Sequence, residues 1–294
     1  MLRHLVPALA AVFLAAAAPG QAFSQDRLRV VATSADLKSL VEAVGGERVA
    51  VESLASPGQD PHAIEVKPAQ LARLRGAALL VRIGLDHEPW LAKIKLGEKI
   101  PVVDASKNVR LLQTETPRLR VERKAHVHAY GNTHYWLDPR NAGPITASIL
   151  QALTALSAAD RGRFEQNRDA FLARLDRKIG QWEAALKPYR GTKAVVVHDS
   201  WAYFAERFGL DVVAAAEPTP GVPPSPAELA ALFQRMREAR VKLVIAEPHS
   251  NPSLVRQIEE KSGARAVTLL PSGDDYVALF DENLRRLAAA LKDG

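Results

Sequence analysis

The sequence predicts an α/β fold of two lobes, each with a mainly parallel sheet, joined by one long backbone helix. Three observations support this fold class. The chain has 294 residues, a length typical of two domains. Short β-branched runs alternate with amphipathic stretches in both halves, as in parallel sheets covered by helices. Between the halves, residues 157–186 contain no proline and two glycines, so one helix about 45 Å long is expected there.

The first half follows a strand–helix rhythm. We expect strands over residues 27–33, 49–54, 78–83 and 102–103. We expect helices over residues 34–44, which Gly45 and Gly46 end, and over residues 68–74, which begin with Pro68. These elements form the N-terminal lobe.

The second half repeats the rhythm after a helical stretch. Residues 142–187 carry apolar side chains mostly at three- and four-residue steps, and Ser157 is a suitable N-cap for the long helix. We then expect strands over residues 193–197, 211–215, 243–246 and 266–269, and helices over residues 201–208, 226–239, 252–261 and 276–291. The predicted division is a leader over 1–24, an N-terminal lobe over 25–141, a helical segment over 142–188 and a C-terminal lobe over 189–294.

The first 24 residues read as a secretory signal peptide. Arg3 supplies a positive start, Ala8–Ala18 an apolar core, and Ala22-Phe23-Ser24 the small residues of a cleavage site. The alternative is a membrane anchor, but the apolar run is shorter than the ~20 residues of a spanning helix. The chain has no cysteine, which excludes disulfides, thiolate metal sites and a lipoprotein anchor. We therefore expect an exported protein of the periplasm with no lipid anchor.

The amino-acid composition indicates a folded protein and limits the kinds of partner that it can bind. Hydrophobic residues make up 47% of the chain and charged residues 24%, which excludes a disordered protein. The formal net charge is +6, without a run of Lys and Arg. A surplus of this size suits solubility, and we expect no nucleic-acid partner.

Three histidines lie just after strands or in loops that face the expected cleft between the lobes. They are His62 in Gln-Asp-Pro-His, His134 before the helical segment, and His198 directly after the strand that includes Val195–Val197. Ligands bind at the carboxyl ends of the strands in open α/β sheets. Neutral imidazoles from three loops can fill three corners of a tetrahedral Zn²⁺ site, so we predict a metal site in the interlobe cleft.

Four motifs carry a resemblance that covers nearly all of the chain beyond the leader. They are Asp60-Pro61-His62, His134-Tyr135-Trp136-Leu137-Asp138-Pro139, His198-Asp199-Ser200-Trp201 and Glu217-Pro218-x-Pro220-Gly221. Together they resemble the cluster A-I zinc/manganese solute-binding proteins of ABC transporters. The resemblance implies a periplasmic, monomeric metal-binding protein that is not an enzyme and delivers its ion to an inner-membrane permease. It leaves room for a periplasmic zinc chaperone as a further partner.

The resemblance also implies which residues hold the ion. The three histidines match the family's first three ligands, and a histidine at the third position, here His198, is typical of zinc importers rather than manganese importers. The fourth ligand is usually a carboxylate between the last strand and the last helix. That position falls near Pro271, so Asp274 is predicted as its substitute, ahead of Glu247, water and Asp275. Asp275 is as well explained as a helix cap.

The remaining histidines and the tryptophans are not predicted to be metal ligands. His126 and His128 are expected to be exposed loop residues, with a transient zinc contact as the alternative. His87 and His249 are expected at the surface. Trp90, Trp136, Trp182 and Trp201 are expected to pack in the core.

Two other classes of function remain as alternatives. One is a secreted zinc hydrolase with Glu247 as its general base, although the sequence lacks H-E-x-x-H and G-x-S-x-G motifs. The other is a binder of an organic solute, which would not need three cleft histidines.

Overall fold

The computed structural model describes residues 27–59, 62, 64–96, 100–113, 131–217 and 222–292. The predicted leader lies outside these residues. The N-terminal lobe is built on four parallel strands in the order β2-β1-β3-β4. They are β1 (Leu28–Ala32), β2 (Val49–Ser53), β3 (Leu79–Arg82) and β4 (Val102–Asp104), with helices α1 (Ala35–Gly45) and α2 (Pro68–Arg75) between them.

The C-terminal lobe repeats the same strand order. Its parallel sheet runs β6-β5-β7-β8, the same arrangement as the first sheet. The strands are β5 (Lys193–Val196), β6 (Asp211–Ala215), β7 (Leu243–Ala246) and β8 (Arg265–Thr268). The helices are α5 (Ala202–Phe208), α6 (Pro226–Ala239), α7 (Pro252–Ser262) and α8 (Tyr276–Lys292). The predicted fold class of two parallel-sheet α/β lobes is confirmed.

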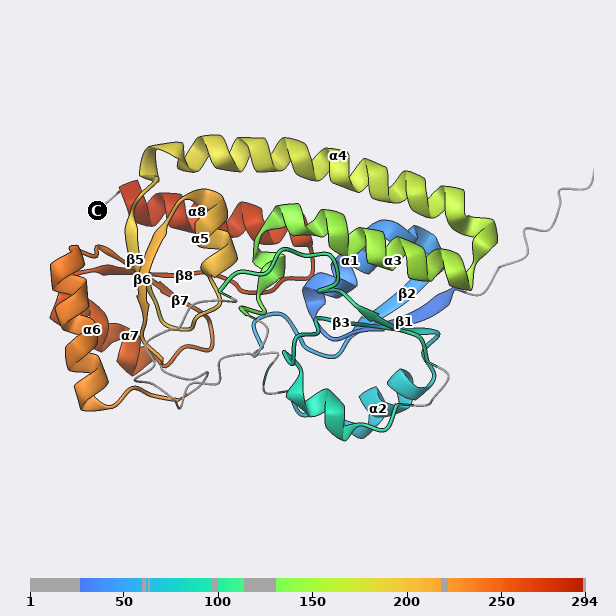
Figure 1. The fold of residues 1–294 in the computed structure, drawn as a ribbon, viewed down its shortest axis with the longest axis horizontal. Coiled ribbons are helices and arrows are strands. Elements are labelled where there is room, and N and C mark those ends of the chain that lie inside the picture. Colours follow the sequence, from blue (N-terminus) through green and yellow to red (C-terminus); the bar gives the residue numbers. More distant parts are fainter. Residues whose placement is uncertain are drawn as a thin grey trace, which may run out of the picture.

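One long helix runs along both lobes (Figure 1). Helix α3 (Ala142–Leu156) leads into α4 (Arg161–Leu186), which has 26 residues. It begins four residues later than Ser157, because Ala158–Asp160 form a 3-10 turn first. Helix α4 packs on α1 and α3 at its N-terminal part and on α5 and α8 further along. It therefore bridges the two lobes, as the sequence predicts.

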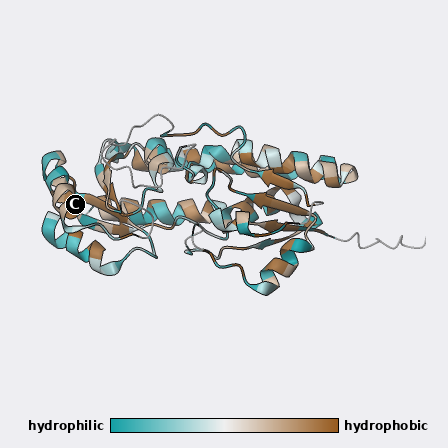
Figure 2. Cartoon of the chain, turned by 60° about the horizontal axis from the view of Figure 1, so that its bottom comes forward, coloured by the Kyte–Doolittle hydropathy of each residue, from teal (hydrophilic) through white to brown (hydrophobic). Residues whose placement is uncertain are grey.

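Successive side chains of each strand point to opposite faces of the sheet, which explains why the two lobes share one layer of helices. Val30 and Ala32 of β1, and Ala194 and Val196 of β5, belong to one core cluster that also contains the buried residues of α1, α3, α4 and α8. Their neighbours face the other way into a separate core in each lobe, such as Val31 with α2 and Val195 with α6 and α7. In Figure 2 the strands are apolar and the helices have one apolar and one polar face. The four tryptophans are buried, as predicted.

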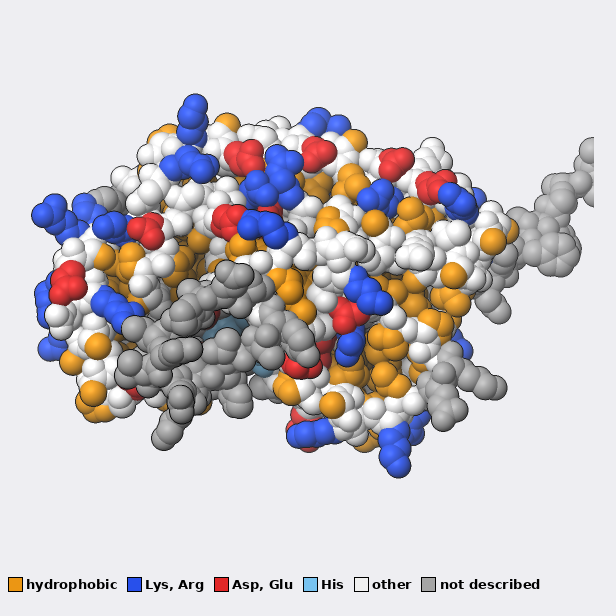
Figure 3. All heavy atoms as spheres, viewed as in Figure 1, with side chains coloured by type: hydrophobic (Ala, Val, Ile, Leu, Met, Phe, Trp, Pro, Cys, Tyr) orange, Lys and Arg blue, Asp and Glu red, His pale blue; other side chains and the backbone are white. Residues whose placement is uncertain are grey.

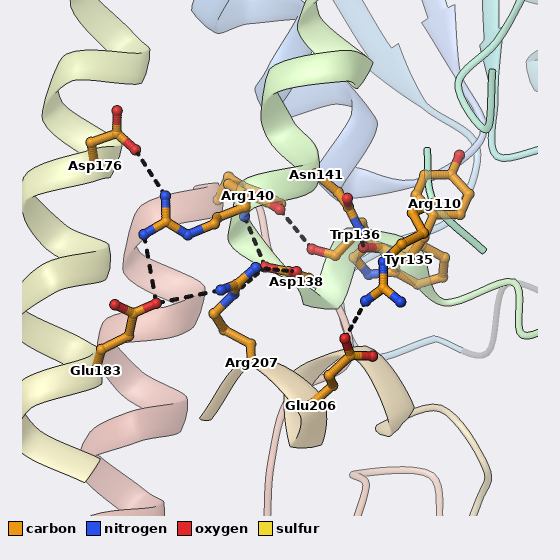
Figure 4. A network of polar contacts seen from close by, with 11 residues as sticks. Arg110, Tyr135, Trp136, Asp138, Arg140, Asn141, Asp176, Glu183, Glu206 and Arg207 are labelled. Atoms are coloured by element: carbon orange, nitrogen blue, oxygen red, sulfur yellow. Dashed lines mark hydrogen bonds and ion pairs between the residues drawn. The ribbon is translucent and has the colours of Figure 1, made fainter. Parts of the chain in front are cut away.

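An ion-pair network joins the lobes beside the start of α3 (Figure 4). Arg207 of α5 donates from Nε and Nη2 to the two carboxylate oxygens of Asp138, both at 2.8 Å. Glu183 of α4 lies 3.5 Å from Arg207 and 3.6 Å from Arg140. A bidentate guanidinium–carboxylate pair fixes orientation as well as distance. The turn that contains Asp138 is therefore held against both α4 and α5.

The face shown in Figure 3 carries both signs of charge. Lys and Arg side chains alternate with Asp and Glu along the upper edge, where α4 runs. Within α4, Arg161 Nε lies 2.8 Å from Glu165 Oε1, one turn further along the helix.

None of the helices in the described part of the chain is long and apolar enough to cross a bilayer.

The last helix provides a first prediction. Asp275 Oδ1 accepts hydrogen bonds from the backbone N–H groups of Val277 (2.8 Å) and Ala278 (2.9 Å), so Asp275 caps α8. Asp275→Ala should lower the free energy of unfolding by about 1 kcal/mol, the usual effect of losing such a cap. Thermal unfolding of the metal-free protein measures this. Asp274→Ala, at the exposed neighbouring carboxylate, is the control, and equal melting temperatures for the two variants would contradict the assignment.

Candidate metal centre

A pocket lies between the lobes at the carboxyl ends of the central strands. Both sheets reverse their strand order between their first and third strands, and such switch points open a crevice for ligands. The pocket is lined by residues of both lobes: Ser34, Asp36, Ala55, Gln59, His62, His134, Trp136, His198, Ser200, Glu247, His249, Pro271 and Ser272. The three predicted histidine ligands are therefore brought together.

Two histidines of the N-terminal lobe already have the spacing of metal ligands. His62 Nε2 lies 3.3 Å from His134 Nε2. Two nitrogens on a tetrahedral zinc ion, each about 2.0–2.1 Å from the metal, are separated by about 3.3–3.4 Å. The Nδ1 atoms face away from the pocket, toward the backbone oxygen of His87 (3.1 Å) and toward Asn132 Oδ1 (3.1 Å) respectively. A hydrogen bond at Nδ1 fixes the tautomer and leaves Nε2 for a metal.

The third histidine faces the other two from the opposite lobe. His198 follows β5, and its ring centre lies 5.9 Å from that of His62 and 5.4 Å from that of His134. His198 Nδ1 lies 3.5 Å from Glu217 Oε2. A carboxylate at this nitrogen can orient the ring of a metal ligand. The three side chains line the same pocket.

Asn132 links the loops of two of these histidines. Its Oδ1 accepts from the backbone N–H of His134 at 3.0 Å, and its Nδ2 donates to the backbone oxygen of Asp199 at 2.8 Å. Tyr203 of α5 donates from its hydroxyl to the Asn132 backbone oxygen at 2.9 Å. The position of the His134 loop is thus fixed relative to the residue after His198.

Glu247 is buried in the pocket wall and is hydrogen-bonded through one of its two oxygens. Its Oε1 accepts from the Ser200 hydroxyl and from Trp201 Nε1 (3.0 Å), and its Oε2 lies 3.2 Å from His249 Nε2. His249 is partly exposed, as predicted, yet it lines the pocket. Glu247 is therefore placed to orient side chains around the site.

The structure places Asp274 outside the pocket. Asp274 is exposed, and Pro271 and Ser272 line the pocket in its place. The loop instead turns its polar groups toward Asp36 of α1, whose carboxylate accepts from Ser272 Oγ (2.6 Å) and Gly273 N (3.2 Å). Trp136 Nε1 also donates to the Pro271 backbone oxygen at 2.9 Å. This part of the C-terminal lobe is bonded to the N-terminal lobe beside the three histidines.

The burial of Asp36 provides a second prediction. Burial raises the pKa of Asp36 to about 7, despite the hydrogen bonds from Ser272 and Gly273. The folded chain therefore holds a proton that the unfolded chain releases above about pH 4, so stability from this group declines as pH rises toward about 7. Between about pH 5 and pH 8 the loss is at most about 3 kcal/mol.

Asp36→Asn keeps the shape and removes the titration. Thermal unfolding of both metal-free proteins across this pH range measures the difference, and other titrating groups cancel in the comparison. Wild type should lose more stability than the variant on going to the higher pH. Parallel curves would contradict the buried acid.

One sequence prediction is wrong. His87 is not a surface residue: its side chain is completely buried, with Nδ1 2.7 Å from Thr133 Oγ1. Its ring centre lies 3.9 Å from that of His62. The signal that could have found it is position, because His87 follows β3, which neighbours β1 at the switch point. The predictions for His126 and His128 fall outside the described residues.

Comparisons with known proteins identify the family of this chain. Residues 30–290 match the family described as "ZnuA: Zinc-uptake complex component A periplasmic". The chain is 24% identical over 299 residues to zinc-binding lipoprotein AdcA of Streptococcus pneumoniae, covering 96% of this chain and 59% of that protein. It is 29% identical over 163 residues to the high-affinity zinc uptake system protein ZnuA of Brucella abortus, covering 54% and 49%. The chain thus spans about half the length of these curated relatives.

A solved structure shares the whole architecture. The crystal structure of a ZnuA superposes with a TM-score of 0.78 at 28% identity and covers 90% of this chain and 99% of that chain. The SBP FpvC of Pseudomonas aeruginosa in complex with Mn²⁺ superposes equally well, with a TM-score of 0.78 at 25% identity and coverage of 91% and 99%. The chain accordingly belongs to the family of the periplasmic component A of zinc-uptake complexes.

Proposed function

We propose that this protein captures Zn²⁺ in the periplasm and delivers it to an inner-membrane ABC permease. The observation that carries the proposal is the convergence of His62 and His134, 3.3 Å apart at Nε2, with His198 of the opposite lobe. The metal is cargo here, bound between lobes that must also release it. The names of the ZnuA and AdcA relatives, which bind or take up zinc, support zinc as the cargo.

Zinc rather than manganese follows from the donor atoms. Three imidazole nitrogens favour zinc, whereas manganese suits carboxylate and water oxygens, and zinc binds nitrogen-rich sites more tightly than manganese does. Titration of the purified chain with each metal against a competing chelator tests this. We expect one tightly bound Zn²⁺ per chain and much weaker Mn²⁺ binding. Equal affinities would contradict a site built on imidazole nitrogens.

A zinc hydrolase is the less favoured hypothesis for the function of the same three histidines. A catalytic zinc needs a general base close to its bound water. Glu247 Oε1 accepts hydrogen bonds from Ser200 and Trp201, and this engagement suits a positioning role. Esterase and peptidase assays on the zinc-loaded sample should show no turnover, and measurable turnover lost in Glu247→Gln would favour the enzyme.

The periplasmic location without a lipid anchor, the monomeric state and a zinc chaperone as partner are parts of the same proposal. The family description supports the periplasm, while the AdcA relative is a lipoprotein. The absence of cysteine from the sequence favours a protein free of a thioether-linked anchor. Mass and solubility of the mature protein recovered from its native cells test this part.

The fourth coordination position yields a third prediction. Asp274 as fourth ligand stays a prediction that requires its loop to turn inward, whereas Glu247 already lies in the pocket. Glu247→Gln should therefore weaken zinc binding by about 10–100-fold, the usual range for a group beside the direct ligands, because it removes a negative charge from the pocket that would hold the dication. Asp274→Asn, the matched neutralisation, should change it less. The reverse order would identify Asp274 as a direct ligand.

A further inference from the structure

His87 is held inside the pocket wall by an unusual stretch of backbone. After β3 the chain passes through three consecutive residues with positive φ: Gly84 (83°), Leu85 (56°) and Asp86 (57°). A Cβ atom at Gly84 would lie 2.2 Å from Asp104 Oδ1, so glycine is required there. Strained backbone of this kind persists where surrounding structure enforces it and is enriched at functional sites. It turns His87 away from solvent.

Glu88 anchors the same loop from the other side. Its carboxylate accepts from the Thr33 hydroxyl (2.6 Å) and from the backbone N–H groups of Ile83 (2.6 Å) and Gly84 (3.0 Å). Three hydrogen bonds to one buried carboxylate define the loop's path closely. The location of His87 is therefore built into the N-terminal lobe.

The His87 ring lies among the histidines of that lobe. One ring nitrogen from each of His62, His87 and His134 lies within 4.8 Å of the others. The ring centre of His87 is 3.9 Å from that of His62 and 5.1 Å from that of His134. All three come from loops of the N-terminal lobe, whereas His198 comes from the C-terminal lobe.

We propose that His62, His87 and His134 form a second position for the cation, held by the N-terminal lobe alone. This position shares two imidazoles with the interlobe position and exchanges His198 for His87. The inference rests on the proposed zinc-binding function. Its consequence is that the ion stays on the N-terminal lobe when the His198 loop withdraws, during capture or release.

The hydrogen bonds of the three rings suit this role. His87 Nδ1 lies 2.7 Å from the Thr133 hydroxyl, His134 Nδ1 lies 3.1 Å from Asn132 Oδ1, and His62 Nδ1 lies 3.1 Å from the backbone oxygen of His87 itself. Metal-binding histidines use one ring nitrogen for such a partner and the other for the metal. In each ring of the triad this partner is at Nδ1, so Nε2 is the atom that we expect to coordinate the ion.

The distances between the ring nitrogens also indicate under which condition the second position would bind the ion. His62 Nε2 and His134 Nε2 are already 3.3 Å apart, whereas for the whole triad one ring nitrogen of each residue lies within 4.8 Å of the others. A tetrahedral edge is about 3.3–3.4 Å, so the rings must close in by up to about 1.5 Å around the ion. The interlobe position uses the same His62–His134 pair and adds His198, whose ring centre lies 5.9 Å and 5.4 Å from theirs. We expect the N-terminal triad to be the weaker of the two positions, because only one lobe then encloses the ion, and to be used when His198 is absent.

A purely structural role is the competing explanation. The His87 ring packs edge-on against Trp136, with centres 5.2 Å apart at 89°. An apolar side chain of similar size would satisfy packing but could not bind zinc. The two explanations therefore predict different outcomes for the same substitution once His198 is removed.

The test uses His87→Leu in the wild-type and His198→Ala backgrounds, with zinc affinity measured by chelator competition. His198→Ala should still bind one zinc, more weakly than wild type. Adding His87→Leu should then cost more than about 100-fold, exceeding the effect of losing an outer partner, while His87→Leu alone should cost less than about tenfold. The matched control is His249→Ala in the His198→Ala background, which removes a different pocket histidine.

X-ray absorption of the zinc-loaded variants gives a second readout, with three imidazoles expected in His198→Ala and two in the double variant. His87→Gln, which can still bond Thr133, should behave as His87→Leu does and guards against a folding defect. Equal affinity of His198→Ala with and without His87 would overturn the proposal, as would complete loss of zinc from His198→Ala. A wild-type chain that fails to bind zinc would instead overturn the proposed function itself.

Discussion

Replacing His134 with alanine should weaken zinc binding by more than about 100-fold, because a direct ligand contributes more than the outer partners whose loss costs about 10–100-fold. His134 is the most central of the proposed ligands: it is buried, it lies 3.3 Å from His62, and its ring faces that of His198. Chelator competition at one fixed pH measures the change. Calorimetry of the same samples gives the number of ions bound per chain.

The control for this substitution is His249→Ala. His249 lines the same pocket, but it is paired with Glu247 and is partly exposed. It should therefore affect zinc affinity far less than His134→Ala. Unchanged affinity and stoichiometry in His134→Ala would refute the assignment of the site.

Acidification should release the ion steeply. For an imidazole with the ordinary pKa of about 6.5, the neutral fraction falls about tenfold between about pH 7.5 and pH 5.5. Because zinc competes with protons for three imidazoles, affinity should fall by about 1,000-fold over that interval. The measurement is zinc affinity at a series of pH values with a chelator whose own pH dependence is known.

The number of ligands controls the slope of this curve. In His134→Ala the same interval should cost about 100-fold, since two imidazoles remain to be protonated. A flat curve for wild type would indicate an oxygen-ligand site and a different metal.

The secondary structure could be predicted closely because local signals agree with the fold. Predicted and observed strands differ by at most one residue at either end, and Gly45, Gly46 and Gly209 lie where helices α1 and α5 end. The apolar alternation in β1 and β5 is satisfied on both faces by helices. The start of α4 was missed by four residues because nothing in the local sequence distinguishes a 3-10 turn at Ala158–Asp160 from a first helical turn.

The site was harder to predict where tertiary contacts override local polarity. The polar sequence Asp86-His87-Glu88-Pro89 suggests a surface loop. The hydrogen bonds of Glu88 instead fix this loop so that His87 is buried. In the same way, Gly273 gives its backbone N–H to Asp36, which leaves Asp274 facing solvent. Each outcome depends on a partner distant in the chain, Thr33 for Glu88 (55 residues) and Asp36 for Gly273 (237 residues), which no local pattern reveals.

The central claim is that one zinc ion binds between the lobes on imidazoles from both. The most direct measurement is an anomalous difference map, recorded on either side of the zinc absorption edge, from crystals of the zinc-loaded protein. The account predicts a single strong peak in the pocket, about 2.0–2.1 Å from one ring nitrogen each of His62, His134 and His198. A peak elsewhere, or one without a ligand from the C-terminal lobe in the closed protein, would contradict it.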